Sequence, residues 1–175
     1  HRRRVFPWYS VPHPFAQLPM PLADGSKVFS SPAAGSPFSV VHDHVVQGCV
    51  IFPGVGYLEM ARAASVAEAQ SSGYVALHGV FFLQPLMLDL HREVSMECVL
   101  SGDGRFQVRS RDAESTMPHA EGELVSTPSH AWRLRDVAAV RAVSPLVGAA
   151  AALFDMFDSV GLQYGPSYRM LEHVW

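Results

Sequence analysis

The sequence predicts an α+β fold in which an antiparallel sheet wraps around one long helix. Residues 54–70 are rich in alanine and nearly free of charge on one face, which is typical of a buried helix. Four strand-like segments follow between residues 75 and 127. The third of them alternates apolar with polar residues, and such alternation favours an antiparallel sheet with one wet face.

The composition limits the class of protein. A chain of 175 residues fits one domain or one large subdomain, and 49% hydrophobic with 17% charged residues is typical of a folded protein. A net charge of −3 predicts no nucleic-acid partner. We expect no membrane partner, because no apolar run reaches the roughly 18 residues of a membrane helix. Cys49 and Cys98 form no CxxC pair, which favours a reduced, cytoplasmic location.

The first third of the chain is predicted to be extended up to a proline break. Residues 1–26 contain five prolines, so we expect a lead-in with little regular structure. A short strand at 27–31, a loop at 32–37 and a longer strand at 38–52 follow, with Gly48 as a bend or bulge. Pro53 and Gly54 end that strand and begin the helix, which Gly73 ends.

The rest of the chain alternates strands with one further helix. We expect strands at 75–88, 92–101, 105–112 and 118–127, with a hairpin turn at "SGDG", residues 101–104. A connector covers 127–144. A second helix then begins with Ser144 as its N-cap and ends at Gly161. This reading divides the chain into a proline-rich lead-in (1–26), a sheet-and-helix subdomain (27–126) and a connector with a helix and turn (127–175).

Two motifs carry a resemblance to a known family. His44, Gly48 and Pro53 form H-x-x-x-G-x-x-x-x-P, and "GLQYGPSYR" contains Tyr164, Gly165 and Pro166. With "HPF" at residue 13, "LQPLML" and "HAEG", they lie in order over residues 13–175. Together they resemble the dehydratase domains of modular polyketide synthases. The resemblance implies the first half of a double hot-dog fold, in which each sheet curls around a long helix.

The resemblance also implies an activity: removal of water from a β-hydroxyacyl thioester. His44 is implied to be the catalytic base, and a neutral imidazole near pH 7 accepts a proton from an acidic carbon. We expect an apolar surround to keep it uncharged. The start of the helix, near Gly54 to Tyr57, is expected to polarise the thioester carbonyl. No metal or nicotinamide cofactor is required, and the substrate arrives on the phosphopantetheine of an acyl carrier protein.

Further candidates for substrate binding follow from the motifs, each with a structural alternative. Gly48 either lets the backbone approach the acyl chain or forms a bulge. Tyr57 either lines the acyl tunnel or packs in the core. Tyr164 either bonds within the site or holds a β-turn. The remaining candidates are Pro53, Gly54, Gly165 and Pro166.

Two other chemistries are weighed and rejected. His42 and His44, two apart, suggest zinc only if a third ligand is nearby, and the sequence places none. Cys49 has no basic neighbour, so we interpret it as a packing residue.

The catalytic partner of His44 is expected outside these residues. In the resembled family an aspartate in a D-x-x-x-Q/H motif supplies the acid, well after the position of Tyr168, and neither Asp155 nor Asp158 fits that motif. We therefore expect a fragment that is inactive alone. Its exposed face is expected to be covered by a second hot dog or by a homodimer. Two alternatives remain: a dehydratase-like isomerase, cyclase or product-template domain, and a non-catalytic structural module.

Overall fold

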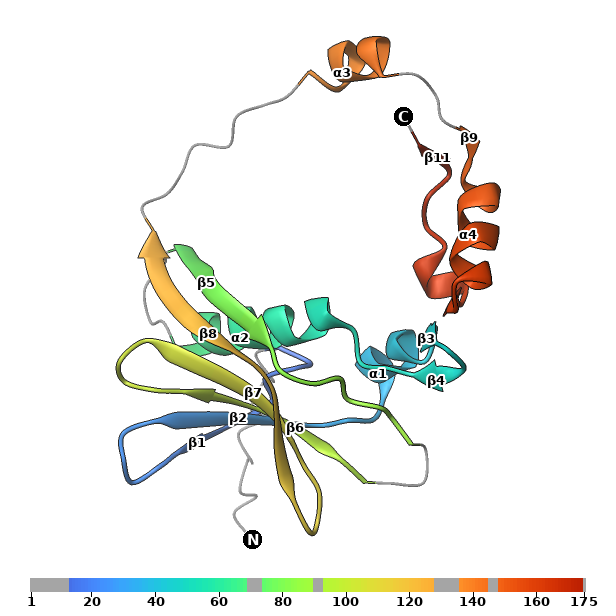
Figure 1. The fold of residues 1–175 in the computed structure, drawn as a ribbon. Helices are drawn as coiled ribbons and strands as arrows, with labels where there is room; N and C mark the ends of the chain where they lie inside the picture. The colour runs from blue at the N-terminus through green and yellow to red at the C-terminus, as the bar shows by residue number, and fades with distance from the viewer. Residues whose placement is uncertain (1–12, 69–73, 90–92, 128–135, 145–147, 175) are drawn as a thin grey trace, which may run out of the picture.

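The computed structural model describes residues 13–68, 74–89, 93–127, 136–144 and 148–174. A six-stranded antiparallel sheet, in the order β1-β2-β6-β7-β8-β5, curves around helix α2 (Gly54–Glu68), as Figure 1 shows. Its strands are β1 (Leu18–Pro21), β2 (Lys27–Pro32), β5 (Tyr74–Phe82), β6 (Ser95–Leu100), β7 (Arg105–Arg111) and β8 (Thr116–Thr127). The predicted α+β sheet around a central helix is confirmed.

Helix α2 begins where the sequence predicts it. Pro53 precedes it, and the Gly56 N–H donates to the Pro53 carbonyl over 2.8 Å in the first turn. Met60, Ala61 and Ala64 are fully buried against the sheet, so the alanine-rich stretch permits a close approach of helix to strands. The described part of the helix runs to Glu68, and both its predicted end at Gln70 and the predicted stop at Gly73 lie outside the described residues.

The core lies between α2 and the concave face of the sheet. Along β7, Phe106, Val108 and Ser110 are buried while their neighbours are not, which confirms the predicted alternation. Residues 101–104 connect β6 to β7 as the predicted hairpin. The main strand residues of this core are Phe29, Met96, Cys98, Leu100, Phe106, Val108 and Ala120.

The prediction of little regular structure in the lead-in is wrong for its last part. Leu18–Pro21 forms β1 and pairs with β2, with Pro19 opposite Phe29 and Pro21 opposite Lys27. A proline cannot donate to a ladder, but β1 is the edge strand of the sheet, where one side needs no donors. Ala16, just before β1, is fully buried.

The long strand predicted over 38–52 is also wrong. Ser36–Val41 forms helix α1, and two short strands follow it, β3 (His44–Val46) and β4 (Cys49–Val50). The valines favour a strand locally, but Gly35 and a proline in the first turn begin a helix that buries Phe38 and Val41 in the core. Tertiary burial therefore overrides the β-propensity of this stretch.

The C-terminal part contains a helix where the sequence predicts a connector, and the helix predicted after it begins later than expected. Ser144 is the C-cap of helix α3 (Val137–Val143), which lies inside the predicted connector and is capped by the Asp136 carboxylate. After β9 (Gly148–Ala149) comes α4 (Ala150–Ser159), so the second helix begins later than predicted. Gly161 follows it with φ of 88°, as expected for a stop residue.

The last described elements are β10 (Leu162–Tyr164), the short helix η1 (Pro166–Tyr168) and β11 (His173–Val174). Among the described helices, none is long and apolar enough to cross a bilayer.

Candidate active site

His44 is held in one tautomer by the backbone. It is the first residue of β3, and its Nδ1 lies 2.7 Å from the carbonyl oxygen of Ile51. A carbonyl only accepts, so Nδ1 carries the hydrogen and donates it. The Ile51 N–H in turn donates to the His44 carbonyl over 3.1 Å. The ring is thereby oriented with Nε2 as its proton-accepting atom, which is the arrangement that a general base needs.

Two tyrosines from the far end of the chain lie against this imidazole. The ring of Tyr164 stacks on it at 5.4 Å between centroids, and the ring of Tyr168 lies tilted at 5.3 Å. Tyr164 reaches His44 because β10 pairs with β3, with these two residues directly opposite. Burial, followed by the neighbouring Tyr164 and Asp43, raises the pKa of Tyr168, so its hydroxyl stays protonated and able to donate.

The Gly165–Pro166 turn is attached to the residue before the histidine. The Gly165 N–H donates to the Asp43 carbonyl over 2.8 Å, and the Ser167 N–H donates to the Asp43 carboxylate over 2.7 Å. A Cβ on Gly165 would overlap that carboxylate, so only glycine fits. Hydrogen bonds from Ser167, the side chain first and then the backbone, lower the pKa of Asp43 and keep it charged. Tyr164 therefore contacts His44, and the Gly165–Pro166 turn is bound to the adjacent Asp43, whereas a role of the three residues in substrate binding stays a prediction.

Gly48 lies in a tight turn, which agrees with the predicted bend, and its approach to the acyl chain stays a prediction. Gln47 and Gly48 form a two-residue turn between paired Val46 and Cys49, with φ of 50° and 76°. This is the left-handed turn of a tight hairpin, where glycine is favoured. A Cβ on Gly48 would meet no protein atom within 4 Å, so backbone conformation rather than a close approach requires glycine. The Gly48 N–H donates to the Gln163 side chain over 2.8 Å, which joins this hairpin to β10.

Tyr57 belongs to the core. It is 3% exposed, its ring stacks on that of His119, and its hydroxyl accepts a hydrogen bond from the Leu86 N–H over 3.2 Å. Burial raises its pKa to about 12. The sequence leaves two alternatives for Tyr57, a residue of the acyl tunnel or a residue of the core, and this geometry agrees with the second.

An apolar groove opens beside the start of α2. Its volume is about 930 Å³, which is within the usual range for a small-molecule site. Phe15, Phe52 and Pro53 line it, together with Val55 from the first turn of α2. Tyr168 lines it as well and contacts His44, so the groove reaches the side of the candidate base. Gly54 lies next to Phe82 instead: a Cβ there would lie 3.2 Å from that ring.

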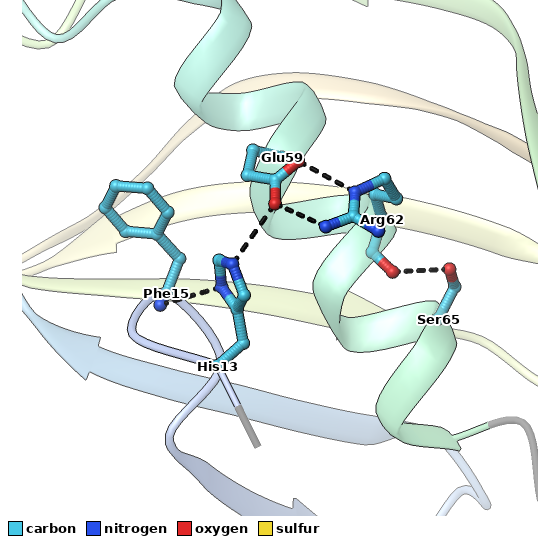
Figure 2. Close-up of polar contacts among 5 residues, drawn as sticks. All are labelled: His13, Phe15, Glu59, Arg62 and Ser65. Carbon is cyan, nitrogen blue, oxygen red and sulfur yellow. Dashed lines mark hydrogen bonds and ion pairs between the residues drawn. The ribbon is translucent and has the colours of Figure 1, made fainter. Parts of the chain in front are cut away.

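The groove has one polar edge, shown in Figure 2. His13 Nδ1 accepts the Phe15 N–H, so its Nε2 carries the hydrogen toward Glu59, 3.1 Å away. Arg62 lies 2.6 Å from the same carboxylate, and its hydrogen bonds lower the pKa of Glu59. These contacts attach the lead-in to α2 at the groove, where His13 and Glu59 both line it.

The described part of the chain offers no metal centre. The strand predicted over 38–52 would place His42 and His44 on one face, but His42 is the C-cap of α1, and its Nδ1 lies 2.7 Å from the Phe38 carbonyl. Within the described ranges no three His, Cys, Asp or Glu side chains gather closely enough to bind a metal ion. Cys49 is exposed and Cys98 is buried, and both are free thiols.

The comparison with known proteins decides the family. Residues 13–111 match the family described as "Polyketide synthase dehydratase domain". The chain belongs to this family. Among curated relatives, the polyketide synthase ThaG of Burkholderia thailandensis is 37% identical over 145 residues, which is 76% of this chain and 2% of that protein. GfsB of Streptomyces halstedii is 30% identical over 95% of this chain and 3% of its own length.

Solved dehydratase structures share the fold. The structure of a CurK dehydratase superimposes with a TM-score of 0.81 at 21% identity and covers 93% of this chain. This chain covers 60% of that structure. The fold is therefore the hot-dog fold of polyketide synthase dehydratase domains, as the motifs implied.

Two contacts in the site are absent from the sequence prediction. The Ile51 carbonyl orients His44, but every residue has a carbonyl, so no sequence signal marks it. Tyr168 contacts both His44 and the groove. Its place as the final aromatic of the "YGPSY" stretch was a signal that it belongs with Tyr164.

Proposed function

We propose that this chain is the first hot dog of a dehydratase that removes water from a β-hydroxyacyl thioester carried on an acyl carrier protein. One observation supports the proposal above others. The Ile51 carbonyl holds His44 with Nε2 as the accepting atom, beside a groove that begins at the first turn of α2. A base, an apolar channel and a helix N-terminus are three of the parts that such an elimination needs, and the fourth is an acid.

In the proposed reaction, His44 Nε2 takes the proton from the α-carbon of the thioester. The electron pair passes toward the carbonyl, whose developing negative charge is stabilised by the positive end of α2 near Gly54. The electrons return to form the Cα–Cβ double bond as the β-hydroxyl leaves. An acid from a second hot dog protonates that hydroxyl, so the products are an α,β-enoyl thioester and water. No cofactor takes part in these steps.

The second hot dog is part of the proposal because this chain spans 60% of the solved dehydratase structure. A histidine-to-phenylalanine and an aspartate-to-asparagine variant of the CurK dehydratase are both described as inactive mutants. The exposed side chains of Val55, Phe82 and Met87, near the start of α2, supply an apolar surface for the second hot dog or, in its absence, for a second copy of this chain. The proposed subdomains are residues 1–26, 27–126 and 127–175, and the free thiols fit a reduced cytoplasm.

The test uses the intact domain, extended through the second hot dog, with a β-hydroxyacyl group on its carrier protein. We expect His44→Ala to abolish formation of the enoyl product, while the circular dichroism spectrum is unchanged. His42→Ala is the matched control, because His42 caps α1 and is expected to retain most activity. Wild-type rates in His44→Ala would remove His44 from the mechanism. We also expect the 175-residue chain alone to form no product, for lack of the acid.

A further inference from the structure

His119 is buried and fixed in one tautomer, and it does not line the groove. It is 1% exposed, its Nδ1 lies 3.1 Å from the Gln84 carbonyl, and its Nε2 lies 2.8 Å from the Ser110 hydroxyl. Since a carbonyl only accepts, Nδ1 donates to Gln84 and Nε2 accepts from Ser110. Burial lowers the pKa of His119, so the ring is neutral in this arrangement. The dehydration mechanism uses neither nitrogen.

His119 is one of several contacts that fix the segment of residues 83–88, which leaves β5 and crosses toward β4. The Leu83 N–H donates to the His119 carbonyl over 2.8 Å, and the side-chain amide of Gln84 donates to the Pro118 carbonyl over 2.7 Å. Pro85 follows directly and restricts the backbone there. The position of the 83–88 segment is therefore set at its start by β8.

The other end of the 83–88 segment holds the residues around Ile51. The Phe52 N–H donates to the Leu86 carbonyl, and the Leu88 N–H donates to the Val50 carbonyl, both over 2.9 Å. Ile51 lies between these two bonds and directs its own carbonyl to His44 Nδ1. The Leu86 N–H is in turn bound by the Tyr57 hydroxyl. Hydrogen bonds joined by the backbone of residues 84–86 and 51–52 thus connect His119 to His44.

We infer that His119 is a positioning residue for the base: by holding residues 83–88, it holds the Ile51 carbonyl that orients the imidazole of His44. This inference rests on the proposed dehydration. A chain of short bonds on rigid elements transmits displacement, and a catalytic group displaced by a fraction of an ångström loses rate. His119 contacts neither His44 nor the groove, so its substitution is expected to change turnover rather than substrate binding.

The test compares two amide substitutions in the intact domain, with the carrier-bound substrate. His119→Asn places an N–H donor where Nδ1 lies and retains the bond to Gln84, whereas His119→Gln places its amide where Nε2 lies and loses that bond. We expect kcat to be about tenfold lower in His119→Gln, with its KM unchanged. In His119→Asn we expect kcat to be near that of the wild type.

The acid limb of the kcat/KM profile is expected to move to lower pH in His119→Gln, because a weaker bond from Nδ1–H of His44 stabilises the imidazolium less. Tyr164, Tyr168 and Asp43, which surround His44, are unchanged in both variants.

Two controls separate positioning from stability. Ser110→Ala removes only the bond at Nε2, so it is expected to lower the melting temperature and to leave kcat and the acid limb unchanged. Tyr57→Phe keeps the ring but removes the acceptor for the Leu86 N–H, so it is expected to reproduce the changes of His119→Gln, and it decides the matter if the His119 variants do not fold. The inference is overturned if His119→Gln folds and leaves both kcat and the acid limb of the kcat/KM profile unchanged. If the His119 variants do not fold, the same result in Tyr57→Phe overturns it. Dehydration that still requires His44 then leaves the proposed function standing, whereas full activity in His44→Ala defeats the proposed function itself.

Discussion

The sheet around α2 and the His44 site are held together by different kinds of contact. Between α2 and the sheet, Met60, Met96 and Val108 are fully buried, and apolar burial is the main stabilising force. The site is a three-stranded assembly, β10-β3-β4, whose aromatic rings are only partly buried. It is closed by hydrogen bonds between residues more than a hundred positions apart, such as Ser167 to Asp43.

This difference predicts separate effects of mutation. Apolar burial is distributed over many side chains, so losing one of them lowers the stability of the whole domain. The site depends on a few polar contacts and one close backbone approach, so a small change there displaces His44 at a modest cost in stability. The following predictions are ordered by the expected change in the free energy of unfolding.

Phe29→Ala tests the sheet. Phe29 is 2% exposed in the centre of the core, and its truncation is expected to lower the free energy of unfolding by about 3–5 kcal/mol. Urea denaturation of the purified chain measures this loss. Val125→Ala on β8 is the control, since Val125 is exposed and is expected to change stability by less than about 0.5 kcal/mol. Equal losses in the two variants would mean that the sheet does not bury Phe29 as described.

Gly165→Ala tests the close approach in the site. The added methyl group overlaps the Asp43 carboxylate, so the turn must move, at a cost of about 1–3 kcal/mol. Because the same turn carries Tyr164 and Tyr168 to the imidazole, the loss of activity in the intact domain is expected to exceed that of Phe29→Ala under native conditions. Gly102→Ala is the matched control, because a Cβ there meets nothing within 4 Å. Wild-type activity and stability in Gly165→Ala would contradict the described turn.

The smallest expected effect concerns the charge of Asp43. Its pKa lies below the ordinary value of 3.8 because Ser167 donates to the carboxylate. A group with a lowered folded pKa stabilises the protein above its ordinary pKa, and that stability is lost as the pH falls through the folded value. Below about pH 4, wild-type stability is therefore expected to fall more steeply than that of Asp43→Asn, as measured by urea denaturation at successive pH values. Parallel pH curves would show that this carboxylate is not bonded in the turn.

The difference between a core held by apolar burial and a site held by a few polar contacts also explains which parts of the structure the sequence predicts. The burial pattern identifies α2 and its start at Gly54 and places the hairpin at residues 101–104, because the period of apolar residues reflects the core directly. It fails for α1, where Val40 and Val41 favour a strand but lie in a helix that buries Val41. It also fails at Ser144, a suitable N-cap that instead ends a helix, because local chemistry permits both.

In the site, motif resemblance predicts the residues but not their contacts. His44, Tyr164 and Gly165 are identified by spacing, and the structure brings them together. Gly48 belongs to the same motif and yet serves a hairpin turn. The bond that orients His44 comes from a backbone carbonyl, which only the path of the folded chain determines.

The most direct test of the central claim is the tautomer of His44. Nitrogen-15 NMR of the intact domain distinguishes protonated from unprotonated ring nitrogens, and His44→Ala assigns the signals. At neutral pH we predict a hydrogen on Nδ1, bound to the Ile51 carbonyl, and none on Nε2. A hydrogen on Nε2 and none on Nδ1 would leave Nε2 unable to accept the α-proton and would contradict the account.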